Sequence, residues 1–176
     1  MRIGLCGTQS VGKTTLVSAL MSLPEFADYN FATERSKYLR DLGIPLNTDS
    51  TLKGQIVFLA ERAAELMNEN LITDRTVVDV MAFTKAAQSI NYYEAEVFCN
   101  LAKNILHEYD YIFYVSPIGV EMEDNGVRTT DLKYREVIDD IIQLNIQHNK
   151  HRIKNLITLS GTTEERIKKM KETIFG

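Results

Sequence analysis

The sequence is poor in cysteine, in net charge and in long apolar runs, and each shortage excludes a class of protein. Only two of the 176 residues are cysteine, Cys6 and Cys99. Neither has the spacing of a metal ligand, so we expect both to be buried free thiols in a reducing compartment. No apolar run approaches membrane-spanning length, and because the chain runs directly into an apolar segment we expect no leader. We therefore expect a cytoplasmic protein with no membrane partner.

The charge and composition are those of an ordinary globular protein. A net charge of −4 gives no sign of broad affinity for nucleic acid, although it is compatible with a local basic groove. The three histidines, at positions 107, 148 and 151, lack metal-ligand spacing, and we expect them at the surface. The length favours a single domain, residues 1–176, because it suffices for a core without disulfide or metal cross-links. The sequence is compatible with a homodimer.

The sequence does contain a phosphate-binding motif near its start. Residues 7–14 fit G-x-x-x-x-G-K-[ST], between an apolar segment typical of a buried strand and a segment typical of a helix. Glycine at both ends of the loop lets backbone N–H groups converge on phosphate oxygens. Lys13 is expected to reach the β- and γ-phosphates, and Thr14 to ligate Mg²⁺. The predicted nucleotide-binding residues are Gly7, Gln9, Ser10, Val11, Gly12, Lys13, Thr14 and Thr15.

Five short apolar segments alternate with helical patterns, which predicts an α/β fold of the P-loop NTPase class. The expected strands are residues 2–6, 28–33, 71–73, 111–115 and 156–159, forming a parallel sheet with helices on both faces. The expected helices are 13–22, 35–42, 52–69, two within 76–108 with a break near 89–92, 131–148, and a last one after Thr162. In the helix at 52–69, helical spacing predicts an apolar face formed by Ile56, Leu59, Ala60, Ala63, Ala64 and Met67. Ligands are expected at the C-terminal ends of the strands.

Acidic residues follow two of these strands. Asp74 is the predicted Mg²⁺ residue, acting directly or through water, because this hard cation favours carboxylate oxygen; a helix N-cap is the alternative. Glu34 is predicted to accept a proton from the acceptor or to fix its hydroxyl, against the alternative of a solvated loop carboxylate. Asp79 is expected to hold Arg75 or to touch the acceptor.

Three arginines are predicted to neutralise the transferred group. Arg75 could bind a phosphate or the acceptor, or form a structural ion pair. Arg128 and Arg135 could close over the phosphoryl group as part of a lid at about 118–135, although a surface arginine is the default. The long polar segment with its Gly126–Arg128 turn favours the lid.

These motifs together resemble a known group of proteins. The chain is similar to small P-loop kinase-like AAA ATPases related to the ribosylnicotinamide kinase domain of NadR-type proteins, within the nucleoside and nucleotide kinases. The resemblance is carried by residues 7–15, 33–39, 73–75, 124–128 and 134–135. It implies an ATP- and Mg²⁺-dependent phosphotransferase with a closing arginine lid. We expect no adenylyltransferase domain like that of NadR, and the resemblance does not imply the acceptor.

The sequence therefore predicts a kinase that moves the γ-phosphoryl group of ATP to a nucleoside, a nucleotide or a related hydroxyl acceptor. A polynucleotide or a hydroxymethylated base in DNA is the rival acceptor, which the acidic net charge does not favour. A partner-regulated ATPase switch is the alternative from another class. The residues assign neither the acceptor nor the base of the donor.

Overall fold

The computed structural model describes residues 1–33, 36–120 and 131–176. Its centre is a five-stranded sheet in the order β2-β3-β1-β4-β5, in which every neighbouring pair is parallel. The strands are β1 (Arg2–Cys6), β2 (Asn30–Ala32), β3 (Leu71–Thr73), β4 (Tyr111–Val115) and β5 (Leu156–Leu159). This order places β1 between β3 and β4, so the loop after β1 lies at the middle of the sheet edge.

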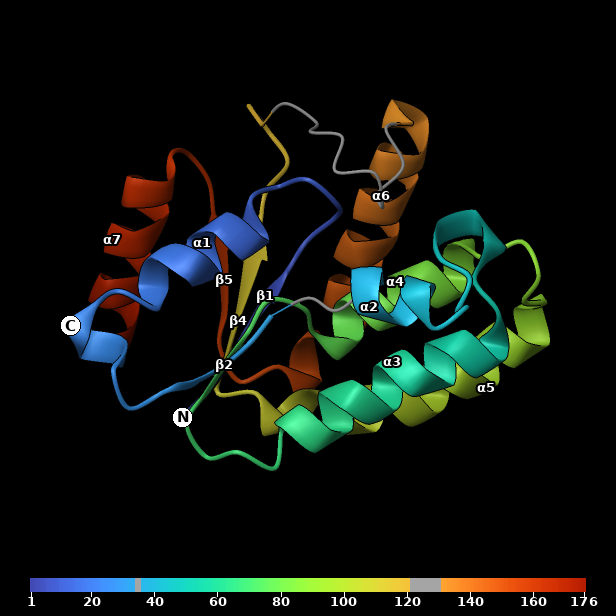
Figure 1. Cartoon of the computed structure of the whole chain (residues 1–176), viewed down its shortest axis with the longest axis horizontal. Coiled ribbons are helices and arrows are strands. Elements are labelled where there is room, and N and C mark those ends of the chain that lie inside the picture. The colour runs from blue at the N-terminus through green and yellow to red at the C-terminus, as the bar shows by residue number, and fades with distance from the viewer. Residues whose placement is uncertain (34–35, 121–130) are drawn as a thin grey trace.

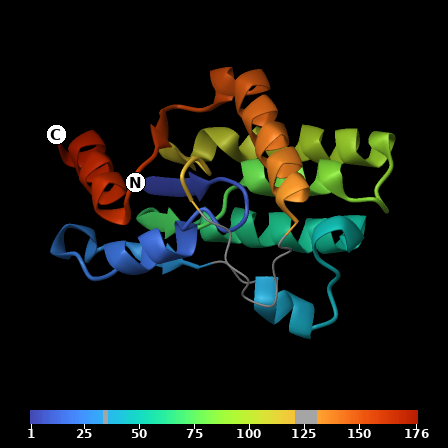
Figure 2. The same ribbon diagram turned by 90° about the horizontal axis from the view of Figure 1, so that it is seen from above.

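Helices cover both faces of the sheet. Figures 1 and 2 show α1 (Lys13–Leu20) and α7 (Thr163–Phe175) on one side, and the larger group of helices on the other. That group comprises α2 (Ser36–Asp41), α3 (Leu52–Glu65), α4 (Val77–Ala86), α5 (Tyr92–Ala102) and α6 (Leu132–His148). Short 3₁₀ turns complete the connections, among them Lys103–Glu108 after α5 and Lys150–Arg152 after α6.

The strands divide their side chains between two cores, as the period of two along a strand requires. Ile3 and Leu5 of β1 lie in the core under α1 and α7, whereas Cys6 lies in the core shared by α3, α4, α5 and α6. In β4, Phe113 likewise lies in the core under α1 and α7, and Ile112 lies in the core on the opposite face of the sheet. Because both faces are covered, the two central strands are nearly continuous apolar runs.

The predicted α/β fold with a five-stranded parallel sheet is confirmed, and the element bounds agree closely with the prediction. The break between α4 and α5 falls at residues 87–91, and Thr162 and Glu165 form the expected capping box at α7. Most of the predicted lid, at about 118–135, lies outside the described residues. Cys6 and Cys99 are free and buried as expected. Within the described part of the chain, no helix has the length and apolarity needed to cross a membrane.

The predicted buried face of α3 is mostly wrong. Leu59 is buried, but Ile56 is 52% exposed, Met67 lies beyond the end of the helix and is 82% exposed, and Gln55 and Arg62 are almost fully buried. The three predicted alanines, Ala60, Ala63 and Ala64, are also exposed. The Arg62 guanidinium is paired with the Glu65 carboxylate, including a 2.8 Å bond from Nε to Oε2. Since this pairing offsets the cost of burying the charge, a polar residue occupies a position that an apolar pattern would not assign.

Candidate active site

The phosphate loop connects β1 to α1 in a conformation that needs its glycines. Gly12 has φ 84°, in the left-handed region that glycine adopts without strain. A Cβ on Gly7 would lie 2.6 Å from the carbonyl oxygen of Val115 on β4. Any side chain at Gly7 would therefore push the loop away from the end of the sheet.

The ammonium group of Lys13 lies inside this loop. Its Nζ donates to the carbonyl oxygens of Gly7 and Thr8, the latter at 2.9 Å, and the side chain is buried. The positive charge is thus held beside the backbone that would receive phosphate, at the N-terminal end of α1. The ammonium charge and the helix dipole together suit an anion.

A carboxylate follows β3 at the same edge of the sheet. Asp74 is fully buried, and its Oδ2 accepts a 2.7 Å hydrogen bond from Oγ1 of Thr14. Its Oδ1 is also buried and has no hydrogen-bond partner among the described residues. The N-cap of α4 is Thr76, so the alternative role of Asp74 as an N-cap is wrong.

This hydroxyl–carboxylate pair fits Mg²⁺. The ion prefers oxygen ligands and is held in nucleotide sites by one or two protein groups together with phosphates and water. An unsatisfied carboxylate oxygen beside a hydroxyl provides that chemistry. Within the described residues no group of three or more histidine, cysteine, aspartate or glutamate side chains could hold a metal by itself.

Asp79 supports the phosphate loop rather than Arg75. Its buried carboxylate accepts from the backbone N–H of Gly7 at 3.0 Å and from the N–H and hydroxyl of Thr76 at 2.8 and 3.0 Å. The expectation that it holds Arg75 or touches the acceptor therefore gives way to a positioning role. It ties the first residue of the loop to the first turn of α4.

Two arginines brace the loop from other elements. Arg135, in the first turn of α6, donates to the carbonyl oxygens of Ser10 at 3.3 Å and Val120 at 2.9 Å. Arg166, on α7, donates to those of Val11 at 2.7 Å and Ser116 at 3.5 Å. Burial lowers the pKa of both guanidinium groups, although each remains a cation at neutral pH.

Sequence reasoning missed Arg166, because nothing local marks a contact across 155 positions. One signal was present. Arg166 and Met170 are one helical turn apart and form the fully buried positions of α7. A charged residue at the apolar stripe of an amphipathic helix requires a polar partner.

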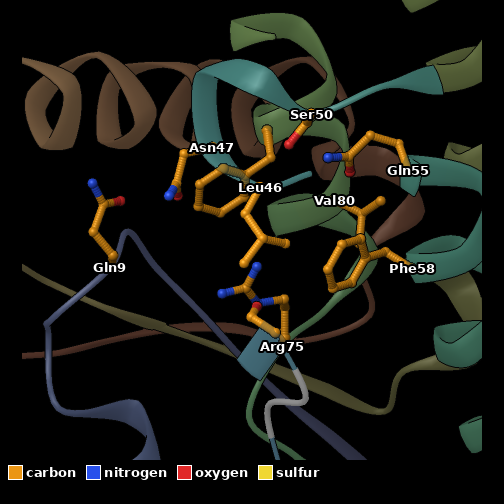
Figure 3. Close-up of a pocket in the computed structure, with 10 residues that line it drawn as sticks. Gln9, Leu46, Asn47, Ser50, Gln55, Phe58, Arg75 and Val80 are labelled. Carbon is orange, nitrogen blue, oxygen red and sulfur yellow. The ribbon is translucent and has the colours of Figure 1, made fainter. Parts of the chain in front are cut away.

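A pocket adjoins the phosphate loop on the side of α3 and α4 (Figure 3). Its lining consists of Gln9, Ser36, Leu46, Asn47, Ser50, Gln55, Phe58, Arg75, Val80 and Phe83. The guanidinium carbon of Arg75 lies 5.0 Å from the centre of the Phe83 ring, a cation–π contact. Gln9 reaches this pocket from the loop, and its buried Nε2 has no acceptor within the described part of the chain.

The structure thus brings together most of the predicted site residues. Lys13, Thr14 and Asp74 form one cluster, Arg135 contacts the loop, and Arg75 lies at the adjoining pocket. Thr15 is exposed on the first turn of α1. Glu34 and Arg128 lie outside the described residues, so their predicted roles stay predictions.

A protein-family model described as an AAA domain matches residues 2–166, nearly the whole chain. The chain belongs to this AAA domain family. A search of curated proteins finds no match. The resemblance inferred from the sequence is therefore confirmed at the level of the family.

Solved kinase structures share the fold. Deoxyadenosine kinase from M. mycoides, with products dCMP and a flexible dCDP bound, is 18% identical with a TM-score of 0.70, and the match covers 99% of this chain and 98% of that one. NadR protein in complex with NAD and AMP-PNP is 14% identical with a TM-score of 0.73, and its complex with NR is 16% identical with a TM-score of 0.74. The match covers 97% of this chain but only about half of NadR. At these identities the likeness establishes a P-loop kinase fold and not a substrate.

Proposed function

We propose that the protein is an ATP- and Mg²⁺-dependent kinase that transfers the γ-phosphoryl group of ATP to a hydroxyl of a nucleoside, a nucleotide or a related acceptor. The observation that carries this proposal is the polar and aromatic lining of the pocket that begins at Gln9 of the phosphate loop and includes Arg75. The pocket has a volume of about 30 Å³, the space of about one water molecule, so it must widen to admit an acceptor. A kinase requires a second pocket beside the triphosphate, whereas a hydrolytic switch requires only a positioned water. The proposal includes a cytoplasmic location.

The residues of the phosphate site have separable roles in this proposal. The loop amides and Lys13 hold the triphosphate, while Thr14 and Asp74 hold Mg²⁺. When bound, the ion would neutralise charge on the β- and γ-phosphates. Arg75 and Arg135 add positive charge near the transferred group, and Arg128 is proposed to join them from the lid segment. Either Glu34 or Asp74 orients the acceptor hydroxyl.

The chemistry of the pocket favours a nucleoside-like acceptor. Gln55 offers a buried amide that can both donate and accept, which suits the edge of a base or a sugar hydroxyl. Phe58 and Phe83 add aromatic rings to the lining, and the face of Phe83 is covered by the Arg75 guanidinium, so Phe58 is the ring on which a planar ligand can stack. The related folds were solved with dCMP and with NR, which supports acceptors of this kind.

The deciding experiment is an ATP-consumption screen with Mg²⁺ against nucleosides, ribosylnicotinamide, mononucleotides and hydroxyl-bearing DNA, with products identified by mass spectrometry. One acceptor that gains a phosphoryl group supports the proposal and names the substrate. Acceptor-independent hydrolysis stimulated by a protein partner would instead favour the ATPase switch. Phosphorylated DNA together with salt-sensitive DNA binding would move the acceptor to nucleic acid.

Two variants test whether product forms at this site. Lys13→Ala should lower kcat/KM by about a hundredfold or more, because it removes a charge that stabilises the moving phosphoryl group. Gln55→Ala should raise KM for the acceptor much more than KM for ATP. A Lys13→Ala enzyme that retains turnover within about tenfold of wild type would show that the phosphate-site assignment is wrong.

A further inference from the structure

A second polar pocket lies at the ends of α4 and α6 that are distant from the phosphate loop. In each helix the first turn contacts the loop, through Asp79 in α4 and Arg135 in α6, and later turns line this pocket. The helix α4 packs against both α5 and α6, on the side of the sheet opposite α1 and α7 (Figure 2). The pocket has a volume of about 320 Å³, enough for a small metabolite.

The lining of this pocket is strongly basic in a protein whose net charge is −4. Lys85, Lys103 and Arg152 line it together with two histidines, His148 and His151, against a single carboxylate, that of Glu96. In the described part of the chain no ion pair engages the three permanent cations. Three cations gathered around a single carboxylate repel one another, and a bound anion would relieve that repulsion.

A buried amide in the pocket also lacks an acceptor. Asn145 of α6 is 2% exposed, and its Oδ1 accepts a 2.9 Å hydrogen bond from Nζ of Lys85. This bond fixes the orientation of the amide, because the flipped amide would direct a donor at the ammonium group. The Nδ2 of Asn145 then has no hydrogen-bond partner among the described residues, and the buried Nε of Arg152 also has none.

The pocket thus contains two N–H donors without acceptors and three cations, an arrangement that suits an anion with several acceptor oxygens. A buried donor left without an acceptor is costly, and phosphate is the small ligand that accepts from several donors at once. We propose that this pocket is a binding site for a phosphate group, either inorganic phosphate or the phosphate of a small metabolite. The site is separate from the phosphate loop and independent of the proposed kinase activity.

The test uses the Lys13→Ala protein, so that binding at the phosphate loop is weakened, and titrates it calorimetrically with inorganic phosphate and with AMP. Asn145→Asp keeps an oxygen for Lys85 but replaces the orphaned donor with a negative charge. It should weaken binding by about tenfold or more, as should Arg152→Gln at the less buried rim. Gln147→Glu, an exposed position on the same helix, makes the same charge change as Asn145→Asp and should leave the affinity unchanged.

The outcomes are distinct. Comparable affinities for inorganic phosphate and AMP would identify the free ion as the ligand. Tighter binding of AMP that Asn145→Asp and Arg152→Gln also weaken would identify a phosphorylated metabolite, because AMP bound at the proposed acceptor pocket would be insensitive to both variants. The proposal is overturned if the Lys13→Ala protein binds neither, or if Asn145→Asp and Arg152→Gln bind as tightly as their parent. Equal loss in Gln147→Glu would also overturn it, since the effect would then be nonspecific. Loss of kinase activity in wild type bears only on the proposed function.

Discussion

At the scale of single residues, the contact between Thr14 and Asp74 is the one that most directly suits a bound Mg²⁺ ion. The two side chains come from different elements and meet at 2.7 Å, with one carboxylate oxygen left over. That arrangement could be anticipated, since a motif residue and a strand-end carboxylate converge wherever parallel strands end at one edge.

Asp74→Asn should raise the Mg²⁺ concentration needed for half-maximal activity by about 10- to 100-fold. The amide keeps the shape and can still accept from Thr14, but it offers the cation no charge. Activity measured against Mg²⁺ concentration checks this result. The control is Thr14→Ser, which retains the hydroxyl and should shift the requirement far less; an unchanged Mg²⁺ profile in Asp74→Asn would exclude the carboxylate from the metal site.

The two thiols should be inert in the native protein. Burial raises the pKa of Cys99 to about 11 and that of Cys6 well above its usual value. At pH 8 only about one Cys99 side chain in a thousand is then a thiolate, the reactive form. Because the pKa of each thiol is raised in the folded protein, thiolate forms and reactivity increases only at a higher pH than for a free cysteine.

A disulfide reagent such as DTNB measures this directly. The native protein should release almost no thionitrobenzoate at pH 8, and two equivalents once it is unfolded in guanidinium. Cys6→Ala and Cys99→Ala assign any residual signal to one position. Rapid reaction of either thiol in the native protein would contradict its burial.

At the scale of elements, α7 acts as a support for the phosphate loop. The guanidinium of Arg166 replaces water for the carbonyl oxygens of Val11 and Ser116, which belong to the loop and to the end of β4. Its Nη1 would also lie 3.2 Å from a Cβ placed on Gly12, so it packs closely under the turn into α1.

Arg166→Ala should lower the free energy of unfolding by about 2–3 kcal/mol, because it leaves buried carbonyl groups unsatisfied. It should also weaken ATP binding, since the loop loses a brace. Chemical denaturation and nucleotide titration measure the two effects. Lys168→Ala, at an exposed position two residues along the same helix, should change stability by about 0.5 kcal/mol or less; equal effects at both positions would contradict the bracing role.

The elements themselves were largely predictable from the sequence, because strand runs, caps and breaks are local signals. Which face of each helix is buried was less predictable. For α3 the apolar pattern assigned Ile56 and Met67 to the core, yet Arg62 is buried through its pairing with Glu65. Likewise Asp79 was expected to hold Arg75 or to touch the acceptor, and instead it accepts a hydrogen bond from the backbone N–H of Gly7. Such choices depend on partners distant in sequence, which periodicity does not encode.

At the scale of the whole molecule, nucleotide binding should stabilise the fold. The loop, Asp74, Arg135 and Arg166 come from the N-terminal, middle and C-terminal parts of the chain, so the site exists only in the folded state. With AMP-PNP and Mg²⁺ at about 100 times Kd, the gain is about 2.7 kcal/mol. For a chain of this length that corresponds to a rise in Tm of about 5–10 °C.

Thermal unfolding with and without AMP-PNP checks this prediction. Lys13→Ala should abolish most of the rise in Tm that AMP-PNP causes. The Tm of the nucleotide-free variant should not exceed that of the nucleotide-free wild type. A nucleotide-induced shift that persists fully in Lys13→Ala would mean that the stabilising site lies elsewhere.

The position of Arg166 has a consequence for the order in which the protein is made. Because 155 positions separate Val11 from Arg166, a ribosome synthesises the phosphate loop well before α7, and the loop emerges long before the side chain that braces it. A nascent chain that already carries Lys13 and Asp74 would still lack the support for Val11 and Ser116. Competence for ATP is therefore expected to arise only after α7 has been synthesised and docks beside α1.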